Sequence, residues 1–446
     1  MLVLLKISTH GLTCKFLERM HYLQHFRNEP SVFSGPEITM DKDALHYGNL
    51  KHREVHNMYG FYHGIATNDG HIKRRNGEDR PFILTRSLFA GSQRYVAKWT
   101  GDNMAEWSHL DIAQPMILAL SASGMPFVGA DVGGFFGNPE SELLVRWYQA
   151  GAFYPFFRAH AHIETKRREP WLFGDDNTQL IRKAIARRYT MLPLYYTLAF
   201  ESMLTGLPYV RPLLMEFPED PSTFPIDNSF MVGSDLLIKP VVEKSVKEVS
   251  LYLPKGVWYD YETGQKFSSE GKTTTVPTSL ESSIPVFHRG GSIIPTQQRL
   301  RRSSQQMVND PYTLRIALNE KGQALGALYI DDGSSFNYLH GDYSYRQFSF
   351  ANNELRGMEG DVSSLIFNRA AINIAKSNRQ VPNVIEKIVI YGVETEPDFV
   401  NIRYSDSQDD SLAELSSKVD FTFENNVLTI RKPNIPISKD FVLKLE

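Results

Sequence analysis

Features that would place a protein in an oxidising compartment or in a membrane are nearly absent from this sequence. Its 446 residues include one cysteine, Cys14, so no disulfide can close within the chain and cysteine usage identifies no redox compartment. The apolar run from Leu2 to Leu5 is interrupted by Lys6, which leaves it too short for the core of a signal peptide. No stretch approaches the roughly 20 apolar residues of a membrane span, and no Asn-x-Ser/Thr glycosylation sequence occurs. The sequence therefore predicts no membrane span, and we find no targeting signal in it.

The chain also lacks an excess of charge of either sign. The 48 Lys and Arg residues oppose 51 Asp and Glu residues, which gives a net charge of −3. This balance creates no field that would attract nucleic acid or an anionic membrane, so we expect no nucleic-acid partner. Aromatic residues are plentiful at 12%, which suits stacking on sugar faces but suits a large ordinary core equally well. A neutral substrate fits this composition best.

The first half of the chain alternates short apolar runs with helical segments, which is typical of βα units around a parallel sheet. Strands that are buried on both faces should be apolar throughout. Such runs cover residues 81–86, 95–99, 125–130 and 153–157, with a remnant near residue 23. From about Arg211 the pattern changes to alternating strands with Pro and Gly turns, which indicates β-sandwich domains.

Capping signals predict two helices in the first half. Asn138 and Pro139 are followed by acidic residues and predict a helix start, while Gly151 predicts the end of that helix. A longer helix is predicted over 178–202, with an interruption at Pro193.

Polar side chains stand at the ends of successive predicted strands. Asp102, Asp131 and His160 each follow such a run, and Arg86 ends the strand before them. Strand ends form the catalytic face of a βα barrel, so we expect these four side chains to converge on one pocket. A single Asp after a strand is more often a helix cap, so the prediction depends on the combination. Asp102 also lies close to Trp99, and partial shielding from water favours the protonated form that a proton donor needs.

These side chains predict a sugar pocket. Hydroxyl groups pair with carboxylates and planar donors, while an aromatic wall covers the apolar face of a sugar ring. A metal site is the competing interpretation and would use His160 and His162 with Asp131, but no further ligand lies at a diagnostic spacing. We therefore expect neither a metal nor a cofactor. The stretch Asp331-Asp332-Gly333 is interpreted as a turn far from this pocket.

The motifs around these residues resemble the α-glucosidases of glycoside hydrolase family 31. The resemblance runs from about Asn28 to the C-terminus. It is carried by Asn28-Glu29-Pro30-Ser31-Val32-Phe33, Thr85-Arg86-Ser87, Trp99-Thr100-Gly101-Asp102-Asn103, Gly129-Ala130-Asp131-Val132-Gly133-Gly134-Phe135, Arg146-Trp147-Tyr148-Gln149, Arg158-Ala159-His160 and Lys166-Arg167-Arg168-Glu169-Pro170-Trp171. It implies an α/β then all-β fold, in which the C-terminal part of a (β/α)8 TIM barrel is followed by two β-sandwich domains. The expected parts are an unmatched segment 1–27, a partial catalytic barrel 28–210, a proximal sandwich 211–298 and a distal sandwich 299–446.

The same resemblance implies a function. It is retaining hydrolysis of a terminal α-linked glucose from an α-glucoside or a glucosylated N-glycan, in the lumen of the endoplasmic reticulum and beside a non-catalytic β subunit. Asp102 would be the general acid and base. The pocket for the departing sugar would be lined by Arg86, Trp99, Asp131, Phe135 and His160. In this mechanism a second carboxylate, roughly 5 to 5.5 Å from the acid, attacks the anomeric carbon.

That second carboxylate is missing from its place in the motif. The family reads Trp-x-Asp-Met-Asn-Glu-Pro, whereas Gln24-His25-Phe26-Arg27 precedes Asn28 here. Phe26 stands where the attacking aspartate belongs, and removal of a nucleophile in another hydrolase cost on the order of 10⁶ in turnover. Glu29, three positions further along, is too far displaced to replace it. We expect hydrolysis by this chain to be lost or nearly lost.

The barrel is also expected to be incomplete. A βα barrel usually has about 250 residues and eight strands, and the sequence provides only the strands named above. Strand 81–86 and its neighbours would leave a sheet edge exposed, which predicts aggregation. The two explanations considered are a gene model without its upstream exons and a truncated isoform. Two functional alternatives stay open: a non-catalytic carbohydrate-binding relative, and a cytosolic α-glucosidase acting on glycogen or maltose.

Overall fold

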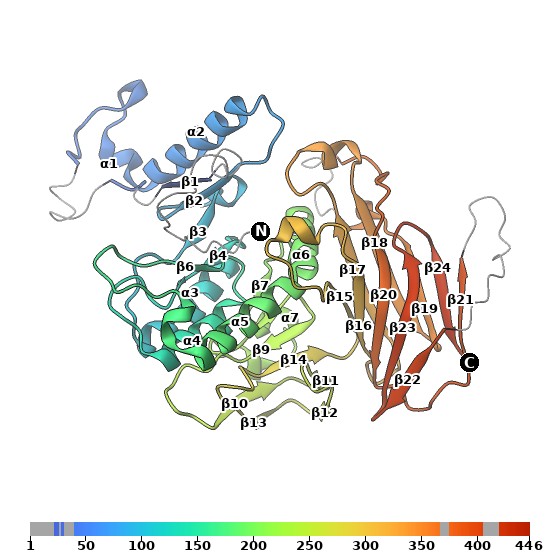
Figure 1. Ribbon diagram of the computed structural model, residues 1–446. Helices are drawn as coiled ribbons and strands as arrows, with labels where there is room; N and C mark the ends of the chain where they lie inside the picture. Colours follow the sequence, from blue (N-terminus) through green and yellow to red (C-terminus); the bar gives the residue numbers. More distant parts are fainter. Residues whose placement is uncertain (1–21, 26–27, 31–39, 366–373, 405–418) are drawn as a thin grey trace.

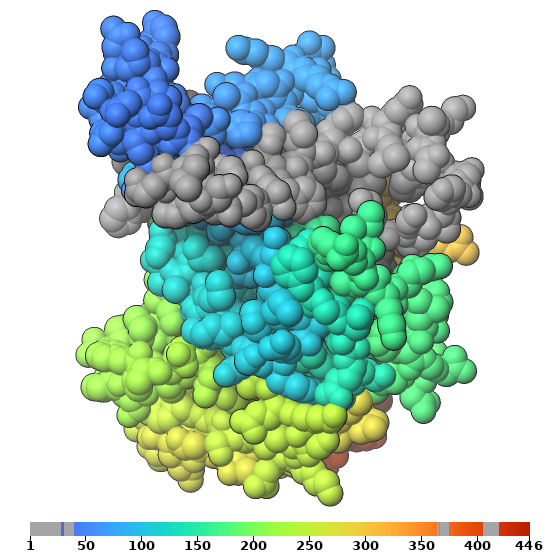
Figure 2. Space-filling model, turned by 90° about the vertical axis from the view of Figure 1, so that its left-hand side faces the viewer, coloured from blue at the N-terminus to red at the C-terminus, as the bar shows by residue number. Residues whose placement is uncertain are grey.

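The computed structural model describes residues 22–25, 28–30, 40–365, 374–404 and 419–446. Three regions follow one another along the chain (Figure 1): an α/β region, a proximal β region and a distal β region. Figure 2 shows one face of the molecule, with residues around 40–75 at the top, the rest of the α/β region in the middle and the proximal β region below.

The α/β region is built around short parallel strands. Strands β1 (Tyr22–His25), β2 (Phe82–Thr85), β3 (Ala97–Trp99) and β4 (Val128–Gly129) pair in this order, all in parallel. A second parallel pair joins β5 (Asp131–Val132) to β6 (Arg158–Ala159). The expected remnant near residue 23 is β1. Because β1 pairs with β2, one edge of this sheet within the described residues is β1, the neighbour of the strand predicted over 81–86.

Helices connect and cover these strands. Their bounds are α1 (His52–Val55), α2 (Tyr59–Arg74), α3 (Trp107–Ala122), α4 (Ser141–Gly151), α5 (Asp175–Thr190), α6 (Leu192–Thr205) and α7 (Leu213–Glu216). The predicted long helix is therefore two helices. Pro193 lies in the first turn of α6, where its missing N–H is tolerated.

The predicted ends of α4 were wrong for physical reasons. The helix begins at Ser141 after an N-cap at Glu140, because the Asn138 side chain accepts a hydrogen bond from the Lys166 backbone N–H at 2.8 Å instead of capping the helix. Gly151 lies inside the helix. A Cβ atom there would come within 2.7 Å of Val132, so this glycine permits close packing on β5.

Residues 153–157 do not form the predicted strand. The Phe153 and Tyr154 N–H groups donate back to the end of α4, and only Phe156 donates to the neighbouring strand, at Val128 O. The carbonyl oxygens of Tyr154 and Pro155 accept hydrogen bonds from the guanidinium of Arg188 at 2.6 and 2.8 Å. An arginine thus replaces the strand partner that an apolar run would otherwise require.

The strands of the two β regions pair mostly antiparallel; in the distal region β15 pairs with β17 and β16 pairs with β20 in parallel. The proximal region has one sheet in the order β12-β11-β14-β9-β8-β7 and the separate pair β10-β13. Its strands are β7 (Val210–Arg211), β8 (Phe230–Val232), β9 (Leu236–Ile238), β10 (Glu248–Leu253), β11 (Gly256–Asp260), β12 (Lys266–Ser269), β13 (Lys272–Pro277) and β14 (Val286–Arg289).

The distal region is one larger sheet in the order β21-β24-β19-β18-β17-β15-β16-β20-β23-β22. Its strands are β15 (Ser292–Thr296), β16 (Tyr312–Ala317), β17 (Ala324–Ile330), β18 (Ser344–Ala351), β19 (Glu354–Glu359), β20 (Val384–Tyr391), β21 (Val400–Tyr404), β22 (Phe421–Glu424), β23 (Val427–Pro436) and β24 (Phe441–Leu445).

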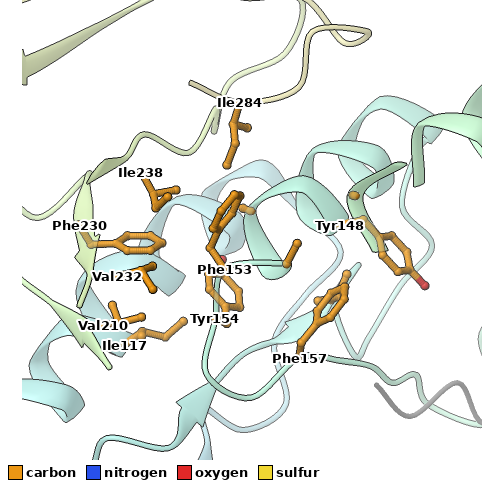
Figure 3. Packing of buried hydrophobic residues seen from close by; sticks show 14 of the residues in the cluster. Ile117, Tyr148, Phe153, Tyr154, Phe157, Val210, Phe230, Val232, Ile238 and Ile284 are labelled. Atoms are coloured by element: carbon orange, nitrogen blue, oxygen red, sulfur yellow. The ribbon is translucent and has the colours of Figure 1, made fainter. Parts of the chain in front are cut away.

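A continuous core joins the α/β region to the proximal region. Phe153 and Tyr154 pack toward Phe230, Val232 and Ile238 of the proximal sheet (Figure 3), and all five side chains are buried. The α/β region is therefore stabilised by direct packing against the proximal β region. No helix in the described part of the chain is long and apolar enough to cross a membrane.

Candidate active site

The carboxyl ends of β2 and β3 bring Arg86 and Asp102 together. Gly101 has a φ of +95°, a conformation that glycine adopts without strain, and the turn that it forms precedes Asp102. Arg86 Nη1 lies 3.4 Å from Asp102 Oδ2. The Asp102 side chain is 28% exposed, so this carboxylate remains open to a substrate.

Arg86 also binds a second carboxylate. Its Nε donates to Glu29 Oε1 at 2.9 Å, and its Nη2 contacts the same oxygen. Lys98 donates from Nζ to the backbone oxygen of Arg86, and burial together with the charge of Arg86 lowers the pKa of Lys98 to about 8. Two cations and two carboxylates thus meet at the ends of β2 and β3. Sequence reasoning missed Lys98, although a lysine inside the apolar run 95–99 was a visible signal.

Asp131 is the first residue of β5, two positions after the end of β4, and is completely buried. Its Oδ1 accepts hydrogen bonds from Arg158 Nε at 3.1 Å and Nη2 at 2.5 Å. Burial raises the pKa of Asp131 to about 6 against the opposing charge of Arg158, and the nearby charge of Asp102 raises it further. Asp131 Oδ2 accepts no hydrogen bond within the described residues, which leaves one acceptor for another donor.

Phe135 and His160 form the aromatic side of this group. Their rings stack with centroids 5.2 Å apart and an interplanar angle of 28°. His162 packs edge-on against Phe135 at 5.5 Å, and its backbone N–H donates to Phe135 O at 2.9 Å. His162 therefore supports the Phe135 ring. Within the described ranges no group of three or more His, Cys, Asp or Glu residues could hold a metal ion.

Trp99, which the resemblance places in the lining of the sugar pocket, is the last residue of β3. It is completely buried and packs with Leu84, Ala97 and Phe156. The guanidinium of Arg158 lies over its ring, 5.5 Å from the centroid. Trp99 therefore contributes a cation–π contact to the Arg158 side chain.

Asn103 connects the two halves of the site. Its Nδ2 donates to the backbone oxygen of Asp131 at 3.0 Å, and its Oδ1 accepts from the backbone N–H of Phe135 at 2.9 Å. Arg86 with Asp102 thus forms one group, and Asp131 with Phe135 and His160 forms the other. Sequence reasoning missed Asn103 and Arg158 as site residues, although both lay within the quoted motifs. Phe26, the position of the missing nucleophile, lies outside the described residues.

Acidic and basic side chains that meet at the carboxyl ends of parallel strands have the arrangement of an active site in a βα-barrel enzyme. Two family models match the chain: the "Glycosyl hydrolases family 31 TIM-barrel domain" over residues 16–198 and the "Glycosyl hydrolase family 31 C-terminal domain" over residues 206–294. The chain belongs to glycoside hydrolase family 31. The family and the fold class predicted from the sequence, part of a TIM barrel followed by β-sandwich domains, are confirmed.

Curated relatives agree with this assignment. The chain is 49% identical over 431 residues to "Probable glucan 1,3-alpha-glucosidase" of Oryza sativa subsp. japonica, which covers 95% of the chain and 45% of the relative. It is 47% identical over 431 residues to "Neutral alpha-glucosidase C" of Homo sapiens, covering 95% and 44%. The chain therefore spans somewhat less than half the length of these relatives.

Solved structures show the same architecture. The alpha3-Glc2-bound glucosidase II alpha subunit matches with a TM-score of 0.85 and 38% identity, covering 95% of this chain and 46% of that one. A structure of the ER glucosidase II heterodimeric complex, which consists of the catalytic subunit and the binding domain of the regulatory subunit, matches with a TM-score of 0.84 and 38% identity, covering 95% and 46%.

Proposed function

We propose that this chain carries the sugar-binding and proton-donating part of a retaining α-glucosidase, with Asp102 as general acid and base. The observation that carries the proposal is the arrangement at the strand ends. Arg86 contacts Asp102, and the buried Asp131 is near enough to feel the charge of Asp102 and has one carboxylate oxygen unused within the described residues. A carboxylate at the rim can exchange a proton with the leaving oxygen, while a buried carboxylate accepts hydroxyl donors strongly.

Terminal glucose fits the remaining groups. Arg158 holds one oxygen of Asp131, so the other oxygen is left to accept from another donor, such as a sugar hydroxyl. The stacked rings of Phe135 and His160 offer an apolar wall with a polar edge, which suits the two faces of a hexose ring.

The finer part of the proposal concerns the biological substrate. The match to the glucosidase II alpha subunit, one structure of which includes the binding domain of a regulatory subunit, supports removal of glucose from N-linked glycans. That reaction would take place in the lumen of the endoplasmic reticulum, with a non-catalytic β subunit as partner.

Sugar binding is the most direct test of the pocket. Calorimetric titration of the whole chain with the iminosugar DNJ, which is bound in one matched structure, is expected to give a saturable heat of binding. Asp131→Asn is expected to weaken binding by about 10- to 100-fold, because a charged acceptor is replaced by a neutral one. Asp176→Asn, an exposed position in α5, is the matched control and should bind normally. A folded chain that gives no heat contradicts the proposal.

The pKa of Asp131 predicts how glucose binding depends on pH. Only the ionised carboxylate is a strong acceptor, so glucose affinity should fall as pH drops through about 6, and should be about tenfold weaker at pH 5 than at its upper limit. The pKa of Asp131 is higher in the folded than in the unfolded chain, so protonation of Asp131 stabilises the fold as the pH drops below 6. Unfolding caused by this group therefore cannot explain a loss of binding at low pH. Titration with glucose, which is uncharged, measures the effect. Asp131→Asn should give a flat profile, and a flat profile in the unmodified chain contradicts the assignment.

A second candidate function is sugar binding without hydrolysis. It is favoured by Phe26, which occupies the nucleophile position in the motif. The binding test above applies to both candidates, and a hydrolysis test separates them.

A further inference from the structure

The loop that follows β5 is shaped by its glycines and connects two residues of the proposed pocket. It runs from Gly133 to Gly137, begins two residues after Asp131 and includes Phe135. Gly133, Gly134 and Gly137 have φ angles of +86°, +80° and +76°, where an ordinary residue would be strained. A Cβ atom on Gly134 would come within 2.4 Å of the backbone nitrogen of Ala105. The loop therefore packs closely against the segment that follows Asp102, and this packing requires contacts that fix the loop backbone.

Arg168 makes the contacts that hold it. Its Nη1 donates to Gly133 O at 2.9 Å and contacts Gly134 O, and its Nη2 donates to Gly137 O at 2.7 Å. Three carbonyl oxygens of one loop thus accept hydrogen bonds from one guanidinium. Arg168 is buried, with 9% of its surface exposed. It follows β6 and is more than 30 residues away in sequence from each glycine that it binds.

The charge of Arg168 is not explained by an ion pair. Among the described residues no carboxylate lies in ion-pair contact with it, whereas its neighbour Arg167 pairs with Glu169 at 2.6 Å. A buried cation is costly unless its surroundings compensate for lost hydration. The positive charge of Arg168 opposes the burial that raises the pKa of Asp131, so the two groups are electrostatically coupled without touching.

We propose that Arg168 is a positioning residue for the glucose pocket: its guanidinium fixes the backbone of the loop 133–137 and thereby the places of Asp131 and Phe135. The inference rests on the proposed sugar-binding function. Arg168 does not itself need to touch the sugar. A planar fork with several donors is required, because one ammonium group cannot reach three carbonyl oxygens in the same arrangement.

The test compares neighbouring arginines in the full chain. Arg168→Gln is expected to weaken DNJ binding by up to about 100-fold, the order of loss that a displacement near 1 Å can produce. Arg167→Gln, at a position whose side chain is 69% exposed, is the matched control and should bind like the unmodified chain. Guanidinium ion at millimolar concentration should partly restore binding to Arg168→Gly but not to Asp131→Asn, a result that a general loss of stability would not produce.

Two further measurements keep the outcomes separate. Hydrogen exchange of the amides of residues 133–137, measured without sugar, should accelerate at least tenfold in Arg168→Gln and stay unchanged in Arg167→Gln. The midpoint of the pH profile for glucose binding should rise in Arg168→Gln, because the positive charge near Asp131 is lost. The midpoint should stay closer to normal in Arg168→Lys, which keeps the charge. Arg168→Lys also replaces Arg168→Gln in the binding and exchange measurements if the Gln variant does not fold. If the unmodified chain binds no sugar, the proposed function fails, and the exchange rates alone decide whether Arg168 holds the loop. If the unmodified chain binds and Arg168→Gln binds equally well, the positioning role is overturned.

Discussion

Replacing Phe26 by aspartate is expected to raise the rate of glucose release from an α-glucoside by several orders of magnitude, up to about 10⁶-fold. The retaining mechanism needs a carboxylate that attacks the anomeric carbon and a second one that donates and accepts the proton. In the function proposed above Asp102 fills the second role, whereas the side chain of Phe26 has no group that could fill the first. The measurement is glucose release from an activated aryl α-glucoside by the purified chain and its variants.

Control variants identify the cause of any gain in rate. Phe26→Asn introduces a polar group of similar size to aspartate without a nucleophile and should leave the rate at the level of the unmodified chain. Adding Asp102→Asn to Phe26→Asp should remove most of the gain. A Phe26→Asp chain that binds DNJ but releases no glucose contradicts this prediction.

Ordinary hydrolysis by the unmodified chain would point to another carboxylate. Glu29 is the first to test, because Arg86 binds its Oε1 while its Oε2 is buried without a hydrogen-bond partner in the described part of the chain. Glu29→Gln would then abolish the activity. If it did not, the attacking group would lie elsewhere.

The main site residues could be predicted because parallel strands end at one edge of a sheet. Arg86 and Asp102 were predicted to converge because both follow predicted strands, and the structure brings them to 3.4 Å. Arg158 could not be found in the same way. It faces Asp131 directly in the β5-β6 register, and a register between short strands is set by tertiary packing that periodicity does not reveal.

Apolar runs predicted strands less well than polar residues at strand ends predicted the site. Residues 153–157 have the composition of a buried strand, yet Arg188 binds the carbonyl oxygens of this segment and the Phe153 and Tyr154 side chains fill the core shared with the proximal sheet. The deciding partner lies more than 30 residues away in sequence. The same limit applies to Asp331, which the sequence presented only as a turn residue.

Asp331 is expected to be among the most destabilising positions in the chain, because its carboxylate joins three parts of the structure. It accepts hydrogen bonds from the hydroxyl groups of Tyr196 in α6 at 2.5 Å and Tyr329 in β17 at 2.9 Å, and Arg80 lies 3.0 Å away. The Asp331 side chain is 1% exposed. Burial raises the pKa of both tyrosines, so both remain hydrogen-bond donors at neutral pH. Asp331→Ala leaves two buried hydroxyls and a guanidinium without their acceptor and should cost about 3 to 5 kcal/mol.

The neighbouring Asp332 provides the control, since it belongs to the same turn but reaches the buried network only through Arg80, at 3.8 Å. Its side chain is 26% exposed, and it accepts from the Ser334 and Ser335 N–H groups at 2.8 Å each, so Asp332→Ala should cost only about 1 kcal/mol, as loss of a comparable cap does. Arg80 lies two residues before β2. Its N–H donates to Ser334 O at 2.8 Å, and the Phe336 N–H donates to Glu78 O at 3.3 Å. Loss of Asp331 should therefore speed hydrogen exchange at Arg80 and Phe336 more than in the proximal sheet. Equal destabilisation by both alanine variants in urea unfolding would show that only the turn matters. A selective effect of Asp331→Ala would instead show that the distal domain holds the strand that carries Arg86 to the pocket.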